Sequence, residues 1–332
     1  MLQPLMPRHA ESAYAFLIAH GLRDVFLASK IHEGALTQPD GAAQGRFLGA
    51  FAGDRLLGVL FIGHGGLVVF AADEPHVRRL FAEEAWKERQ RARLVVGEWD
   101  AVTDVWGQLA ASGLTADRDW REVFMVVTAE SLLDEPEPGL IAATREDLPE
   151  LVDVSARAYH EETGEDPLVV MGEGYVRHVT RNVEEQRTFL VREKGRIAFK
   201  AELSARCPIG AQIVGVFTEP VLRGRGFARR GTAELARRLM STAPPAPGAA
   251  RPMAAVPAVC LFVREDNAAA RRAYERAGFA PQMYYRRLFV DPASTRPRAA
   301  GAAEASAPAG RAAPLSRPPT TPAGRGSSAS RS

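Results

Sequence analysis

The sequence is poor in cysteine, since its 332 residues include only Cys207 and Cys260. Two thiols are too few for a secreted disulfide framework and their spacing does not suit a zinc site, so we expect a reducing, cytoplasmic location and no bound metal.

Long apolar runs are also lacking. The longest, residues 56–72, contains four glycines, which predicts two buried strands and a turn rather than a transmembrane helix. The N-terminal segment does not have the pattern of a signal peptide.

The sequence also lacks a strong excess of positive or negative residues. The net charge is only +2, and much of the excess arginine lies near the C-terminus, so we expect no large basic surface on the folded part. Apolar residues make up 46% of the chain and charged residues 25%, a composition typical of soluble globular proteins. Neither nucleic acid nor a membrane is an expected partner.

The length and the distribution of proline and glycine predict two domains and a tail. Residues 1–134 form the first predicted domain, and the proline-containing segment 135–140 marks the boundary. The second domain spans residues 139–292 and includes a loop inserted at 241–258, where five prolines interrupt the periodic pattern. Residues 293–332 are almost entirely Ala, Pro, Ser, Gly, Thr and Arg, so this tail is predicted to be disordered.

Hydrophobic periodicity predicts a mixed α/β domain in the N-terminal half. Its expected helices lie at residues 11–20, 74–91 and 101–112, and its expected strands at 46–52, 56–62, 67–71, 94–97 and 121–128.

The C-terminal half has a similar pattern. Helices are expected at residues 148–159, 174–182, 226–240 and 268–277, and strands at 139–142, 188–192, 197–203, 211–218, 259–263 and 284–289. Thr144 followed by Asp147 approximates a capping box before the first of these helices. The order near the end, with a strand, a glycine-rich turn, a helix, a strand, a helix and a strand, is distinctive.

The glycine-rich turn is the main candidate for a binding site. Arg223-Gly224-Arg225-Gly226-Phe227-Ala228 connects the strand at 211–218 directly to the helix at 226–240. A helix N-terminus carries unpaired N–H groups and partial positive charge, and glycine lets a ligand approach the backbone, so a phosphate site is physically expected. A strand-to-helix turn without a ligand also fits these six residues.

Two motifs in the correct order resemble the GNAT (Gcn5-related) N-acetyltransferases. Arg223, Gly226 and Ala228 match the Arg/Gln-x-x-Gly-x-Gly/Ala signature that binds the acetyl-CoA pyrophosphate in that family. The second motif consists of an apolar strand, an asparagine, Ala-x-x-x-Tyr and Gly-Phe, matched by 261–263, Asn267, Ala270, Tyr274 and 278–279. The resemblance covers about residues 141–292 and implies the mixed-sheet GNAT fold.

The whole chain resembles a bacterial two-domain GNAT group whose N-terminal domain has no defined function. The N-terminal half has the helix, hairpin, strand and helix order of a GNAT domain but no counterpart of the Arg223 loop. The hypothesis for this half is a degenerate, cofactor-free copy of the same fold.

The resemblance implies a set of cofactor contacts. Val216, Phe217 and Thr218 would diverge from the neighbouring strand, bind the pantetheine arm and direct an N–H at the thioester oxygen. The loop from Arg223 to Ala228 would bind the pyrophosphate. Arg225 and Arg229 either pair with the cofactor phosphates or face solvent. Asn267 either binds the cofactor arm or caps the following helix, and both roles are compatible.

Two residues are catalytic candidates. Tyr274 stands where the family often has the tyrosine that protonates the coenzyme A thiolate, although a helix residue packed on the sheet would also fit. Glu202 lies on a strand next to the motif strand, where it is either the base that accepts the amine's proton or a solvated carboxylate. Tyr159 to Glu162, at a helix end, are candidates for contacts with the acceptor, with His160 not expected to bind metal.

The expected activity is transfer of an acetyl group from acetyl-CoA to a primary amine, on a small molecule or a protein N-terminus, by direct attack in a ternary complex. A covalent route through cysteine is disfavoured, because neither Cys207 nor Cys260 has a histidine positioned by the sequence. The alternative is a non-catalytic acyl-CoA-binding sensor. A homo-oligomer is compatible with the sequence.

Overall fold

The computed structural model of the chain describes residues 1–37, 45–133, 137–241 and 254–295. Most of the predicted inserted loop at 241–258 and of the predicted disordered tail therefore lies outside the described residues, as do two residues of the boundary segment 135–140. The described residues belong to one compact unit, Met1–Arg296.

The N-terminal half begins with a short strand and two helices, continues through three antiparallel strands and a helix, and ends with a strand, a helix and a long strand. Its elements are β1 (Leu2–Pro4), α1 (Ala10–Ala19), α2 (Val25–His32), β2 (Gly45–Ala52), β3 (Arg55–Gly63), β4 (Leu67–Ala72), α3 (Pro75–Lys87), β5 (Leu94–Glu98), α4 (Trp99–Ala111) and β6 (Ala116–Thr128). All elements predicted for this half are present, with ends that differ by a few residues, and β1 and α2 were not predicted.

The C-terminal half repeats this order with one additional short helix, α6. Its elements are β7 (Leu140–Ala142), α5 (Leu148–Thr163), α6 (Pro167–Val170), α7 (Glu173–Glu184), β8 (Thr188–Glu193), β9 (Arg196–Cys207), β10 (Gly210–Thr218), α8 (Phe227–Met240), β11 (Ala258–Arg264), α9 (Ala268–Arg276) and β12 (Ala280–Val290). The predicted capping box is confirmed, because the Thr144 N–H donates to Asp147 Oδ2 at 2.7 Å in the turn before α5. The two halves are thus two copies of one mixed α/β arrangement.

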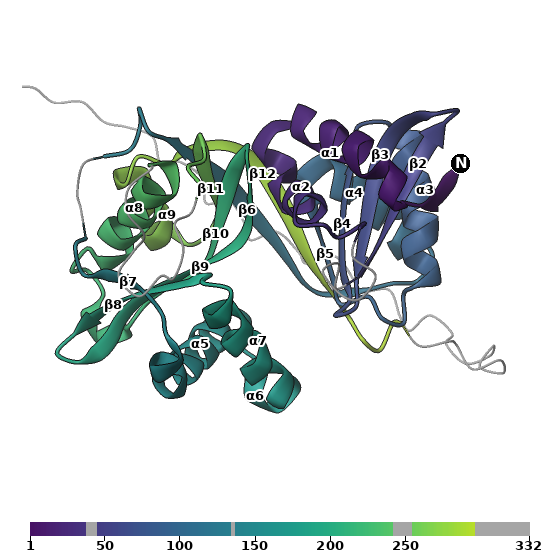
Figure 1. The fold of residues 1–332 in the computed structure, drawn as a ribbon. Coiled ribbons are helices and arrows are strands. Elements are labelled where there is room, and N and C mark those ends of the chain that lie inside the picture. The colour runs from purple at the N-terminus through teal and green to yellow at the C-terminus, as the bar shows by residue number, and fades with distance from the viewer. Residues whose placement is uncertain (38–44, 134–136, 242–253, 296–332) are drawn as a thin grey trace, which may run out of the picture. The chain divides into compact units, whose positions relative to one another are not determined.

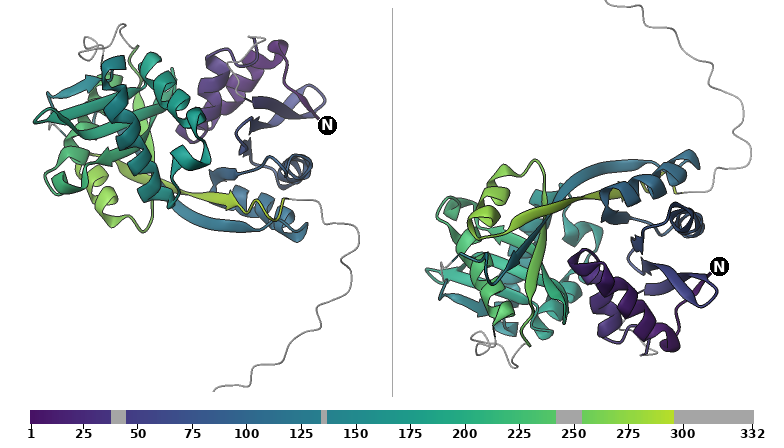
Figure 2. Two further views of the ribbon diagram at one scale, coloured as in Figure 1. Left: turned by 90° about the horizontal axis from the view of Figure 1, so that it is seen from below. Right: turned by 90° about the horizontal axis from the view of Figure 1, so that it is seen from above.

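The described residues form one sheet of twelve strands that runs through both halves, in the order β1-β2-β3-β4-β5-β12-β6-β11-β10-β9-β8-β7 (Figure 1). The two halves exchange their last strands. The strand β6 pairs antiparallel with β11, whereas β12 pairs antiparallel with β5. These two strands also pair with each other along most of their length, and Figure 2 shows them side by side. The exchange places side chains of the N-terminal half inside the C-terminal sheet.

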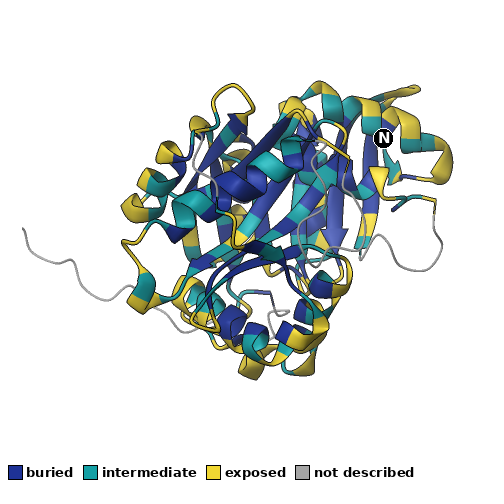
Figure 3. Ribbon diagram, turned by 60° about the vertical axis from the view of Figure 1, so that its left-hand side comes forward, coloured by how far each residue is buried: buried dark blue, intermediate teal, exposed yellow. Residues whose placement is uncertain are grey.

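The hydrophobic cores reflect this exchange. The core under the C-terminal strands includes Val123, Met125 and Val127 from β6, and the main core of the N-terminal half includes Leu288 and Val290 from β12. Buried residues follow the strands, while exposed residues line the outer sides of the helices (Figure 3). In the C-terminal half, α8 and α9 cover one face of the sheet, and α5 and α7 cover the other (Figure 1). Every helix in the described ranges is too short or too polar to cross a bilayer.

Candidate functional site

The site begins where two parallel strands separate. Pairing between β10 and β11 runs only from Ala211 and Val259 to Ile213 and Leu261. Both strands continue beyond that point, to Thr218 in β10 and to Arg264 in β11. Backbone groups of the two strands past the last pair therefore face an opening instead of each other. The predicted divergence of the motif strand is present in the structure.

A β-bulge shapes the same stretch of β10. The register with β9 shifts between Val214 and Phe217, and Gly215 has a φ of +57°. Side chains rarely adopt this left-handed conformation, so the bulge favours glycine at this position. The bulge turns the strand at the opening, and Val216 and Phe217 line the cavities on both sides of it.

The predicted phosphate loop lies at the N-terminus of α8. Gly224 and Gly226 have φ values of +78° and +84°, and Gly226 is the N-cap of the helix without a side chain to cap it. The first helical hydrogen bond runs from Arg230 N to Gly226 O at 3.0 Å. The N–H groups of Phe227 and Ala228 precede that bond, so they are available to an anion.

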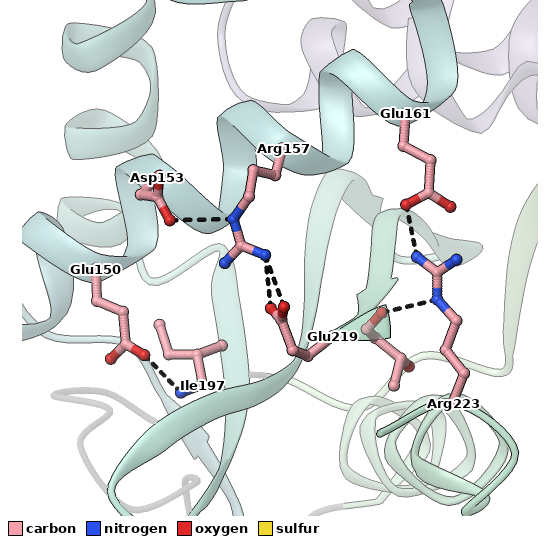
Figure 4. A network of polar contacts seen from close by, with 8 residues as sticks. Glu150, Asp153, Arg157, Glu161, Ile197, Glu219 and Arg223 are labelled. Carbon is pink, nitrogen blue, oxygen red and sulfur yellow. Dashed lines mark hydrogen bonds and ion pairs between the residues drawn. The ribbon is translucent and has the colours of Figure 1, made fainter. Parts of the chain in front are cut away.

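The arginines of this loop are held by carboxylates. Arg223 Nη2 lies 2.6 Å from Glu161 Oε2, and Arg225 Nη2 lies 2.7 Å from Glu193 Oε1. Figure 4 shows Arg223 pointing toward Glu161 on α5. The Nε of Arg223 also donates to the carbonyl oxygen of Thr218 at 3.1 Å. A phosphate that binds here therefore competes with existing ion pairs.

A second ion pair ties α5 to the segment that precedes the loop. Arg157 Nη1 donates to both carboxylate oxygens of Glu219 at 2.8 Å, and its Nε donates to Asp153 at 3.1 Å (Figure 4). Together with the Glu161–Arg223 pair, this contact fixes the loop against α5 at two points.

Two cavities meet at the opening. One has a volume of about 570 Å³ and is lined by Thr218, by the loop from Leu222 to Arg229 and by α9. The other has a volume of about 730 Å³ and lies between α5, α7 and the strands β9 to β11. We call them the cofactor cavity and the acceptor cavity. Both are lined by Glu161, Val216, Phe217, Asn267, Ala270 and Tyr274.

The chemistry of the cofactor cavity fits a phosphorylated, amide-containing ligand. All the predicted cofactor residues line it: Val216, Phe217, Thr218, Arg223, Gly224, Arg225, Gly226, Phe227, Ala228, Arg229 and Asn267. The Thr218 Oγ1 is buried and has no hydrogen-bond partner among the described residues. A buried hydroxyl without a partner is costly, so this group is suited to a polar atom of a ligand.

Tyr274 lies between the two cavities. It is only 6% exposed and lines both of them. Burial raises the pKa of its hydroxyl, and the negative charge of Glu162 raises that pKa further. The hydroxyl therefore keeps its proton at neutral pH. Such a group can donate a proton to an anion that forms beside it.

Asn267 caps α9, as one of its two predicted roles requires. Its Oδ1 accepts a hydrogen bond from Ala270 N at 3.1 Å. The side chain also lines both cavities. The capping bond uses only the oxygen, so the amide nitrogen is available to a ligand.

Glu202 lies in the acceptor cavity, with both carboxylate oxygens engaged. Oε1 accepts from Lys200 Nζ, and Oε2 accepts from Asn182 Nδ2 at 3.0 Å. Asn182 also lies 3.3 Å from His178 Nε2. Burial lowers the pKa of His178, so this imidazole is neutral at neutral pH. The interpretation of Glu202 as a freely solvated carboxylate does not match its surroundings, since its side chain is 14% exposed.

Sequence reasoning missed several residues of the acceptor cavity. Tyr175, His178 and Val179 line it from one face of α7, and Lys200 lines it from β9. The spacing of three and four residues on a predicted helix was a usable signal for the first three. Glu122 also lines the cavity, from the exchanged strand β6, and no local pattern indicates it. Of the candidates at the end of α5, Tyr159, Glu161 and Glu162 line the cavity, whereas His160 does not.

Solved structures with the same architecture identify the fold. A GCN5-related N-acetyltransferase from Sphaerobacter thermophilus aligns over 90% of this chain and 96% of its own, with 18% identity and a TM-score of 0.53. A tandem GNAT protein from the clavulanic acid biosynthesis pathway aligns over 90% and 99%, with 12% identity and a TM-score of 0.50. The chain has the GNAT acetyltransferase fold. A Drosophila protein aligns over 88% and 98%, with 13% identity and a TM-score of 0.57. No protein-family model and no curated protein matches the sequence.

The N-terminal GNAT-like half has a different junction at the position equivalent to the phosphate loop. There β4 is followed by Asp73 and Glu74, and Pro75 begins α3. Two carboxylates repel phosphate, and no glycine gives access to the backbone. The cavity between β4 and β5 has a volume of only about 30 Å³ and is lined by Phe26 and Tyr285, among others. This junction therefore lacks the exposed backbone that the loop before α8 offers to a phosphate.

Proposed function

We propose that this protein is an N-acetyltransferase that moves an acetyl group from acetyl-CoA to a primary amine, by direct attack in a ternary complex. The observation that carries the proposal is the meeting of two cavities at the divergent ends of β10 and β11. One cavity has an anion site at a helix N-terminus, and the other contains the Glu202 carboxylate, which can accept a proton. The GNAT fold supports acyl transfer.

The residues of the opening supply the electrostatic part of the reaction. The thioester that acetyl-CoA supplies would lie against β10, where the bulge leaves Gly215 and Val216 out of the ladder with β9. A backbone N–H in this stretch stabilises negative charge on the carbonyl oxygen. The phosphate loop and Arg223 hold the distant end of the cofactor and so fix the position of the acetyl group.

Two groups would move protons. An attacking amine must be neutral, so a base has to accept the proton that it loses. Glu202 lies in the acceptor cavity and would be this base. It is held by a hydrogen bond from Asn182, which in turn contacts His178. The Tyr274 hydroxyl, which retains its proton because of burial, donates to the departing sulfur. Both side chains line the acceptor cavity, so the acid and the base can act on the same bound acceptor.

Amine-dependent release of free thiol from acetyl-CoA tests the proposal, with mass spectrometry of the acceptor to find the added acetyl group. Acetylated product together with a stoichiometric amount of thiol supports the transferase. Tight binding of acetyl-CoA without transfer to any amine would favour the acyl-CoA sensor instead.

Replacing Tyr274 by phenylalanine removes the proposed acid with little change in packing. We expect Tyr274→Phe to lower kcat by about 10²-fold, the usual contribution of a positioned acid, while the Kd for acetyl-CoA changes little. Steady-state kinetics and calorimetry measure the two quantities. An unchanged kcat would show that Tyr274 acts only as a packing element and is not the acid.

Replacing Glu161 by glutamine removes the carboxylate that competes with phosphate for Arg223. We expect Glu161→Gln to bind acetyl-CoA about two- to fivefold more tightly, a modest effect because both partners of the ion pair are about half exposed. Asp153→Asn, on the same helix, removes a charge that contacts Arg157 instead and is the matched control. Unchanged or weaker binding by Glu161→Gln would place the phosphates away from Arg223.

A further inference from the structure

The acceptor cavity has more negative than positive groups. Five carboxylates line it, from Glu122, Glu161, Glu162, Glu202 and Asp266, against only two cations, Lys200 and Arg264. Both cations are committed locally, because Lys200 pairs with Glu202 and Arg264 pairs with Asp266, at 2.9 Å for its Nε. Glu161 pairs with Arg223 and Glu122 with Arg287, which leaves Glu162 as the one lining carboxylate without an ion pair among the described residues. Its charge favours a cation in this part of the cavity.

Glu122 comes from the N-terminal half and is almost fully buried. It is 3% exposed, and its carboxylate receives only one nitrogen among the described residues, Arg287 Nε at 3.1 Å. Its neighbour across the ladder, Arg264, is turned toward Asp266 instead. Burial raises the pKa of Glu122, and a bound cation would favour its ionised form.

Glu162 and Ser155 line the same cavity from α5. Glu162 forms no ion pair with any described residue, although its charge influences Glu122, Arg264, Arg287 and Tyr274. Ser155 is 3% exposed, and its Oγ has no hydrogen-bond partner in the described ranges. A buried hydroxyl without a partner and a carboxylate without an ion pair, both lining one cavity, can accept hydrogen bonds from the N–H groups of a ligand.

We propose that the acceptor is an amine that carries a second positive charge, and that Glu122 and Glu162 recognise this charge while the neutral amine attacks the thioester. This inference rests on the proposed function of the same cavity. It also gives the N-terminal half a role, because the exchanged strand β6 supplies one of the two recognition groups. Glu122 and Glu162 are specificity residues and take no part in proton transfer.

Three small amines of equal length test the proposal: 1,4-diaminobutane, 1-aminobutane and 4-aminobutanoate. Each is titrated calorimetrically into the full chain saturated with coenzyme A, so that binding is measured without turnover. We expect the diamine to bind about tenfold more tightly than the monoamine, since a hydrogen-bonded ion pair contributes about that much. The amino acid, which brings a carboxylate into a negative cavity, is expected to bind most weakly.

Variants test whether Glu122 and Glu162 cause the preference for the diamine. Glu162→Gln and Glu122→Gln should each reduce the preference for the diamine over the monoamine by several-fold, and Glu122→Asp should preserve part of it. Glu162 is exposed, so its variant tests the idea even where a change at buried Glu122 disturbs folding. Glu165→Gln is the matched control, because Glu165 follows α5 but pairs with Arg118 and does not line the cavity.

The outcomes separate this proposal from the proposed function. Equal or undetectable binding of the diamine and the monoamine, or a preference unchanged in both glutamine variants, overturns the cation site. Thiol release without preference for a dication leaves the transferase intact and rejects this proposal. Preferential binding of the diamine without thiol release supports the cation site and rejects the transferase.

Discussion

Gly226→Glu is expected to abolish acetyl-CoA binding, weakening it by about 10²-fold or more. Gly226 begins α8 with a φ of +84°, and the N–H groups that follow it form the expected phosphate site. A glutamate here brings a negative charge to the position of the pyrophosphate, and its side chain would fill the approach to the backbone. Loss of two charge-assisted hydrogen bonds accounts for a change of this size.

A control variant separates phosphate binding from backbone strain. Gly195 has a φ of +79°, in the turn between β8 and β9, with open space around the position of an added Cβ. Gly195→Glu therefore adds the same charge and similar backbone strain outside both cavities, without the close approach to Arg230 that an added Cβ makes at Gly226. The thermal shift that acetyl-CoA causes measures binding in both variants. Equal shifts in Gly226→Glu and in the unmodified chain would contradict the assignment of the loop.

The C-terminal half produced alone is expected not to fold. A chain of residues 139–295 lacks β6, which pairs with β11 from Ala258 to Arg264 and with most of β12. It also lacks Val123, Met125 and Val127, all at most 4% exposed in the core. Each such side chain contributes about 1.5–3 kcal/mol. Their sum is comparable with the total stability of a domain, about 5–15 kcal/mol.

The comparison chain ends at residue 295 and keeps residues 1–138, so it contains every element that the structure describes. We expect this chain to show a cooperative thermal transition and to remain monodisperse on gel filtration, whereas residues 139–295 aggregate. A soluble 139–295 fragment that unfolds cooperatively and binds acetyl-CoA would show that the strand exchange is dispensable.

Local features of the site could be predicted from the sequence. The strand, the glycine loop and the helix follow one another directly in the sequence, so their order can be predicted from local patterns. The same holds for Asn267, which caps the helix that follows it. The bulge at Gly215 could not be predicted from local patterns, because the register shift depends on how β10 pairs with β9. Glu202 is a candidate from the sequence because of its position beside the motif strand, whereas its bonds to Lys200 and Asn182 depend on how β9 and α7 pack.

The exchange of the last strands could not be predicted from local patterns. Both β6 and β12 have an apolar run, at 123–127 and 288–290, and either strand could pair with a strand of its own half. The choice is set by contacts between residues far apart in the chain, such as Val123 with Val263. For the same reason Glu122 was not recognised as part of the acceptor cavity.

Calorimetric titration of the full chain with acetyl-CoA tests the central claim most directly, because it counts the sites as well as measuring affinity. The phosphate loop at α8 and the small, acidic junction at the equivalent position of the N-terminal half predict one acetyl-CoA per chain. A single site with this stoichiometry supports a C-terminal cofactor site within two GNAT-like halves. Two equivalent sites, or no binding at all, would contradict it.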